Sequence, residues 1–248
     1  MLAIYKKELR SYFVNPHGYV FAGIFLVLSA IVFSYTTLLS QSYDTSAYFT
    51  VMVFAYTVLI PLLTMRLFTE EKKLRTEQLL MTAPVSVTGM VLGKFLAAAT
   101  LYLSCTLLSC LNFIPLYLIA AAERGNLSYD TTHIGPITPN IIGCTVGIIL
   151  VGMAFIAIGS FISSLTENQL AAAIITIATL ISLTAIGLFS SLIDVYAIRV
   201  VINWISIFGR FSYFSMGVFD IASLIYFASL AFVFIFLTVR VYEKRRFS

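Results

Sequence analysis

Residues 66–86 read RLFTEEKKLRTEQLLMTAPVS, a short charged stretch that separates two long apolar runs. It holds three of the chain's eleven acidic residues and four of its fifteen basic residues. Its side chains form no metal-ligand cluster and no catalytic constellation. A charged, helix-forming connector between apolar runs is typical of a membrane face, where a soluble partner can dock. The stretch therefore predicts a membrane protein with a docking element between two of its spans.

The composition of the whole chain favours lipid as its solvent. Of 248 residues, 60% are hydrophobic and 10% are charged, whereas soluble domains are about 25% charged. A water-soluble fold of this size cannot cover so much apolar surface. The formal charge of +4 is small and its basic residues gather at span ends, so it gives no argument for nucleic acid.

The cysteines do not indicate a disulfide or metal-binding protein, and the N-terminal residues do not indicate a signal peptide. Cys105, Cys110 and Cys144 lie in apolar runs without a CxxC pair, so we interpret them as small buried hydrophobic residues. The first residues, MLAIYKKELRSYF, have helically spaced apolar positions and no prompt cleavage site. We therefore expect no signal peptide there.

Six stretches are long and apolar enough to cross a bilayer, which takes about 20 helical residues. The predicted spans are residues 19–39, 47–68, 89–121, 141–165, 170–193 and 221–242. The third contains Asn112 and Pro115, so we expect a kink or break there. The prediction is an all-α polytopic membrane protein that forms a single domain over residues 1–248.

The basic residues predict the orientation of these spans. An even number of spans puts both termini on one face, together with the connector 69–88. Twelve of the fifteen Lys and Arg residues fall on that face, and Arg124, Arg199 and Arg210 fall on the other. The positive-inside rule makes the richer face cytoplasmic. We therefore expect both termini and the docking connector inside the cell.

Two further segments are predicted to lie at the membrane surfaces. Residues 1–15 form an amphipathic interfacial helix, either a simple anchor or an elbow helix that contacts a cytoplasmic partner. The candidate residues of this elbow helix are Tyr5, on its apolar face, and Lys6, Lys7, Glu8 and Arg10 on the remaining faces. The long connector 194–220 is too apolar for open water, and we expect one or two short helices at the outer leaflet with Trp204 at the interface.

The chain lacks the residues that would let it drive chemistry or transport alone. It has no GxxxxGK[ST] and no HExxH motif, and His17 and His133 are expected on opposite membrane faces. The centres of the six predicted spans contain no ionisable side chain, although proton and ion paths usually need one. An energy source on another polypeptide is therefore expected.

The fifth span carries three hydroxyl side chains at a spacing of three residues. They are Thr176, Thr179 and Ser182. The spacing favours a common helix face, and two interpretations stay open. The hydroxyls belong either to a closely packed helix interface or to a candidate translocation path between two subunits.

Two motif groups together resemble a known family. Residues 76–80 (TEQLL), 83–86 (APVS) and 93–94 (GK) resemble the first cytoplasmic loop of ABC-2-type permeases. Residues 214–220 (FSMGVFD), followed by 225–227 (IYF), resemble the entry to that family's last span. The likeness is greatest to the gliding-motility permease group and its relative in nitrous-oxide reductase maturation. One departure is Arg75, where the family often has Gly before the loop threonine.

The resemblance implies a mechanism and a set of partners. Two permeases, identical or paralogous, pair in the cell membrane, and each receives a cytoplasmic ATP-binding subunit. The chain is then not itself an enzyme and needs no cofactor, because ATP and Mg²⁺ bind to the partner, and export fits better than import. The implied ATPase-coupling interface comprises Glu70, Glu71, Lys72, Arg75, Thr76, Leu79, Leu80 and Pro84.

Two other classes of function stay open. A membrane-embedded lipid enzyme would need a cluster of acids, His or Ser at one face, and only Glu70 and Glu71 form an acidic pair. A non-transporting membrane subunit, moved mechanically by an ATPase, would use the same docking loop. Substrate-stimulated ATP hydrolysis distinguishes a transporter from that subunit. The sequence does not identify the substrate or decide between a homomeric and a heteromeric pair.

Overall fold

The computed structural model describes residues 1–40, 42–76, 86–126, 135–189, 202, 204, 206–215, 217 and 220–247. All regular structure in these residues is helical, which confirms the all-α fold. The elements are α1 (Leu2–Val14), α2 (Pro16–Phe33), the π-helical turn η1 (Ser34–Leu38), α3 (Ser46–Thr64), α4 (Thr69–Lys73), α6 (Val87–Ser109), the 3₁₀ turn η2 (Cys110–Phe113), α7 (Ile114–Asn126), α8 (Thr138–Leu165), α9 (Gln169–Phe189), α11 (Ile207–Ser215) and α12 (Ile221–Phe247).

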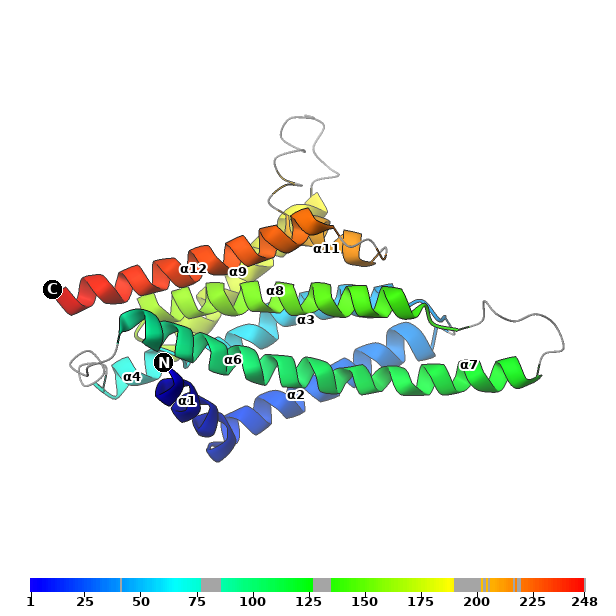
Figure 1. Cartoon of the computed structure of the whole chain (residues 1–248), viewed down its shortest axis with the longest axis horizontal. Coiled ribbons are helices and arrows are strands. Elements are labelled where there is room, and N and C mark those ends of the chain that lie inside the picture. The colour runs from blue at the N-terminus through cyan, green and yellow to red at the C-terminus, as the bar shows by residue number, and fades with distance from the viewer. Residues whose placement is uncertain are drawn as a thin grey trace.

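Six helical stretches in the described part of the chain are long and apolar enough to cross a membrane, as the sequence predicts. They are Pro16–Leu38, Ser46–Lys73, Val87–Glu123, Thr138–Leu165, Gln169–Gly187 and Ile221–Arg246. The long helices lie side by side in one bundle (Figure 1). Both termini and α4 lie toward the same end of this bundle, and α7 extends to the opposite end. Which end faces the cytoplasm stays a prediction from the basic residues.

Helix α8 occupies the centre of the bundle and packs against α3, α6, α9, α11 and α12. Close approach is possible because small residues line this helix. A Cβ atom on Gly152 would lie 2.2 Å from the Tyr102 ring of α6, and the Tyr102 hydroxyl donates to the Ile148 carbonyl at 2.7 Å. A larger residue at position 152 would displace the Tyr102 ring and its hydrogen bond to Ile148.

The predicted interruption of the third span is confirmed. Helix α6 passes through the 3₁₀ turn η2 into α7, and η2 contains Asn112. The Asn112 side chain donates to the Ser29 hydroxyl at 2.9 Å, and Ser29 shares a further hydrogen bond of 2.9 Å with Tyr48. These hydrogen bonds connect η2 to α2 and α3. They also satisfy the Asn112 side chain, because a polar group inside a bilayer needs a protein partner.

The predicted outer connector is described only in part. Within it, α11 packs its buried Ile207, Phe211 and Phe214 against the bundle. Trp204 is exposed, and its ring lies 5.1 Å from the guanidinium carbon of Arg210. Residues 190–201, which include the last predicted residues of the fifth span, lie outside the described part of the chain.

Candidate functional site

A buried lysine joins three helices at the end of the bundle that carries both termini. Lys94, on the second turn of α6, is 1% exposed. Its Nζ lies 3.0 Å from Glu8 Oε1 of α1 and 2.8 Å from Glu71 Oε1 of α4. It also donates to the Leu67 carbonyl at 2.8 Å. These three acceptors use all three N–H donors of the ammonium group, so the buried charge is paired and fully hydrogen-bonded.

A second lysine balances the charge of this cluster. Lys7 Nζ lies 3.5 Å from Glu71 and 3.6 Å from Glu8, and its side chain is 61% exposed. Two lysines and two carboxylates therefore share one site with no net charge. The Phe68 ring, 5.4 Å from Lys94 Nζ, covers the cluster on one side. We call Lys7, Glu8, Glu71 and Lys94 the ion cluster.

Helix α1 lies directly on the start of α6. A Cβ atom on Gly93 would come within 3.3 Å of Ile4, Tyr5 and the Met1 carbonyl, so glycine permits this close approach. The Tyr5 hydroxyl forms a 3.1 Å hydrogen bond with Thr100. The apolar side of α1 is thus partly used within the chain, while Leu2, Phe13 and Val14 remain exposed.

Helix α4 is attached to the end of α8. The Lys72 ammonium donates to the carbonyl of Ser164 and, at 3.0 Å, to that of Thr166. These carbonyls belong to the C-terminal end of α8, which carries partial negative charge. The Ser163 hydroxyl accepts from the Phe68 amide at 3.2 Å. The Arg66 guanidinium lies 2.6 Å from the Glu70 carboxylate.

The departure from the family pattern at Arg75 falls on a strained backbone position. Helix α4 ends in a Schellman motif, because the Arg75 amide donates to Lys72 and the Thr76 amide donates to Glu71, at 3.1 and 2.9 Å. Arg75 has a φ of 56°, a left-handed conformation that usually belongs to glycine. This geometry gives a physical reason for the glycine that the resemblance expects.

The structure separates the predicted coupling residues into three groups. Glu71 is 12% exposed and, like Lys72, makes its contacts within its own chain. Glu70 is 38% exposed and pairs with Arg66, while Arg75 is exposed and Thr76 is half-buried. Leu79, Leu80 and Pro84 lie outside the described residues.

The predicted elbow residues also divide. Glu8 turns into the ion cluster, whereas Lys6 and Arg10 are exposed. From the sequence, Lys94 is only a basic residue at the start of a span, and its role in the ion cluster is not apparent. A lysine one to two turns inside an apolar helix was the available signal, since such a charge needs a partner.

The three hydroxyls of α9 do not share one environment. Thr176 is buried inside the subunit, Thr179 is half-buried and Ser182 is exposed. Each donates to the carbonyl four residues earlier in its own helix, at 2.7 to 2.8 Å. Of the three, Ser182 is the exposed residue, and a residue that faces a second subunit has to be exposed on its own subunit.

A metal centre finds no support in the part of the chain that the structure describes. There, no group of three or more His, Cys, Asp or Glu side chains could hold a metal ion. His133 lies outside the described residues, as does Arg199. Cys105 and Cys144 are buried and Cys110 is partly buried, all three as free thiols.

Comparison with known proteins identifies the family. No curated protein matches the chain. The model of the family described as ABC-2 family transporter protein matches residues 29–241. This match includes all or part of each of the six candidate spans. The chain therefore belongs to the ABC-2 transporter family, as a membrane domain with six candidate spans.

Proposed function

We propose that the chain is the permease subunit of an ABC exporter. Two permeases, identical or paralogous, form the translocation path, and a cytoplasmic ATP-binding subunit docks on each. The partner binds ATP and Mg²⁺ and performs the hydrolysis. Export, and the likeness to the gliding-motility group, rest on the motifs in residues 66–94 and 214–227. Orientation with both termini in the cytoplasm rests on the distribution of basic residues.

The ion cluster is the observation that supports this proposal most. It joins α1 and α4, the two elements that would face the ATPase, to α6, which continues into the membrane. Removing one partner from a buried ion pair costs about 3–5 kcal/mol. A force on α4 therefore moves α1 and the start of α6 with it. Through Lys72 the same force reaches the end of α8.

This arrangement gives the predicted coupling residues different roles. Glu8, Glu71 and Lys72 act as positioning residues, because their charged atoms are bound inside the chain. The residues available for direct contact include the exposed basic side chains Lys6, Arg10, Lys73 and Arg75. Such a surface fits an acidic patch on the ATPase. Leu79, Leu80 and Pro84 keep their proposed role as apolar contacts.

Affinity purification in mild detergent tests the assembly. The tagged chain is isolated, its partners are identified by mass spectrometry, and the eluate is assayed for ATP hydrolysis. A partner with a Walker motif and measurable hydrolysis supports the proposal. A chain that purifies without any ATPase contradicts it. Hydrolysis that rises when extracted cell lipids and amphiphiles are added supports an exporter over a subunit that is only moved mechanically.

Two substitutions of Arg75 separate its charge from its backbone conformation. Arg75→Ala and Arg75→Gly both remove the cation, and each should weaken ATPase association about twofold to fivefold, the range of an exposed ion pair. Only glycine relieves the left-handed strain, so Arg75→Gly should be more stable than Arg75→Ala by about 1 kcal/mol. Unchanged association in both variants would remove Arg75 from the interface.

A further inference from the structure

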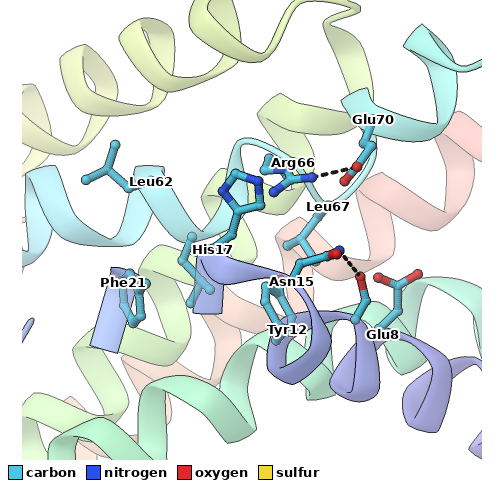
Figure 2. Close-up of a pocket in the computed structure, with 11 residues that line it drawn as sticks. Glu8, Tyr12, Asn15, His17, Phe21, Leu62, Arg66, Leu67 and Glu70 are labelled. Atoms are coloured by element: carbon cyan, nitrogen blue, oxygen red, sulfur yellow. Dashed lines mark hydrogen bonds and ion pairs between the residues drawn. The ribbon is translucent and has the colours of Figure 1, made fainter. Parts of the chain in front are cut away.

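A small cavity lies next to the ion cluster, between α1, the start of α2 and the junction of α3 with α4 (Figure 2). Its volume is about 50 Å³. A buried water needs at least about 10–15 Å³ on the same measure, so the cavity accepts a few water-sized groups. It lies where α2 and its candidate span begin, at Pro16. This is the level at which lipid head groups meet a span.

The side chains around the cavity change from apolar to basic to acidic from one side to the other. Figure 2 shows apolar Phe21 and Leu62 on one side, His17 and Arg66 in the middle, and a carboxylate, Glu70, on the other side. The order follows from the sequence. From the end of α3 into α4, Leu62, Arg66 and Glu70 are spaced four residues apart. His17 and Phe21 have the same spacing at the start of α2, which runs in the opposite direction.

The charged groups retain capacity for a ligand. Arg66 Nη2 lies 2.6 Å from Glu70 Oε1, but a guanidinium has five N–H donors, and one carboxylate uses at most two of them. A second acid, Glu8, lines the same cavity and is 15% exposed. Burial raises the pKa of the Tyr12 phenol, which also lines the cavity, so this hydroxyl stays a hydrogen-bond donor at neutral pH.

We propose that this cavity binds the head group of a phospholipid that carries a primary amine, such as phosphatidylethanolamine. The phosphate lies between His17 and Arg66, and the ammonium group lies toward Glu70 and Glu8. The acyl chains leave past Leu62, which is 39% exposed. The order of groups along the cavity matches the order of tail, phosphate and amine in the lipid.

The charge balance selects this head group over related ones. Arg66 is paired with Glu70, and Glu8 is paired with the two lysines of the ion cluster, so the described residues around the cavity offer no unpaired cation for a head group that carries only negative charge. A quaternary amine is bulkier and has no N–H to donate to a carboxylate. A primary ammonium donates to both acids and adds a charge-assisted hydrogen bond to each. The site uses only groups of this chain, so it does not depend on the proposed ATPase partner.

Lipid binding to the purified, delipidated full chain tests the proposal. Its melting temperature and lipid affinity are measured in detergent with phosphatidylethanolamine, phosphatidylcholine, phosphatidylglycerol and soluble phosphoethanolamine. Phosphatidylethanolamine should bind most tightly and raise the melting temperature most. Equal binding of phosphatidylcholine, or tighter binding of phosphatidylglycerol, overturns the proposal. Equal binding of phosphoethanolamine also overturns it, because the ligand is then a soluble group and not a lipid.

A matched pair of substitutions locates the site. Glu70→Gln should weaken phosphatidylethanolamine binding about tenfold, the effect of losing one charge-assisted hydrogen bond. Glu243→Gln is the control, because Glu243 pairs with Arg240 at 2.8 Å on α12, outside the cavity. It should leave binding unchanged. His17→Ala, at an exposed position, should weaken binding too and remains informative if Glu70→Gln misfolds. Equal effects of Glu70→Gln and Glu243→Gln, or full binding by His17→Ala, overturn the assignment.

Discussion

At the scale of single residues, Lys94 determines how the charged end of the bundle is organised. A lysine that is 1% exposed is tolerated only because three acceptors surround its ammonium group. Arg75 illustrates a different constraint, since its backbone takes a conformation that glycine adopts without cost. Both residues therefore depend on their surroundings more than on their own helix propensity.

Substitution of Lys94 should destabilise the chain strongly. In Lys94→Met, Glu8 and Glu71 remain largely buried without their buried cation and keep only the longer, exposed contacts with Lys7. The expected loss is about 3–5 kcal/mol of unfolding free energy. Chemical unfolding in detergent measures it. The triple variant Lys94→Met, Glu8→Gln, Glu71→Gln should recover much of that loss, because Lys7, the one cluster charge that remains, is 61% exposed to solvent. Lys7→Met is the control and should cost less than about 1 kcal/mol, since Lys7 is exposed. Equal losses for Lys94→Met and Lys7→Met would contradict the role given to Lys94.

At the scale of elements, the short helix α4 depends on its attachments. A helix of five residues is far below the length that is stable alone in water. Lys72 attaches it to α8, Glu71 attaches it to α6, and a Schellman motif closes its C-terminal end. The start of α12 is fixed differently. Asp220 accepts hydrogen bonds from the Ala222 and Ser223 amides at 3.1 Å and from the Ser223 hydroxyl at 2.7 Å.

The cap of α12 predicts a pH dependence. The Ser223 hydroxyl, two backbone amides and Arg210 lower the pKa of the Asp220 carboxyl below its usual value. A depressed pKa means that the carboxylate stabilises the folded chain at neutral pH, and this contribution is lost as pH falls through the folded-state pKa. Asp220→Ala should therefore lower the melting temperature at pH 7. Its difference from the parent should shrink below about pH 4.

Asp220→Asn is the matched control for this cap. Asparagine keeps an oxygen that caps the helix but does not titrate. It should retain most of the stability at pH 7 and lose the acid-dependent part of the curve. A difference between Asp220→Ala and the parent that stays constant from pH 7 to pH 3 would contradict the assignment of the cap.

At the scale of the whole molecule, the bundle concentrates its polar attachments at one end. The two termini, α4 and the ion cluster lie together there (Figure 1), while α8 packs in the centre. We expect this end to be cytoplasmic. A reporter that works only in the cytoplasm should be active when it is fused to either terminus. A reporter that works only outside the cell should be active when it is placed in the connector between η1 and α3. Termini on opposite sides would contradict the predicted even number of spans.

The sequence by itself determined that lipid surrounds the chain, that the fold is helical, that there are six candidate spans, and which family the chain resembles. These properties follow from local quantities, the length and apolarity of each stretch and the order of short motifs, which do not depend on how helices pack. It also located the interruption near Asn112, because polar residues and proline disturb an apolar helix locally.

Only the tertiary structure decided which charges meet. Lys94 is 86 residues from Glu8 and 23 from Glu71, so their pairing depends on the positions of α1 and α4 against α6. For the same reason the sequence could not tell that Glu71 turns inward while Arg75 stays exposed. The cavity beside His17 and Arg66 likewise requires four helices, α1, α2, α3 and α4, to converge. Burial and charge pairing are properties of the packed bundle, and no single helix contains them.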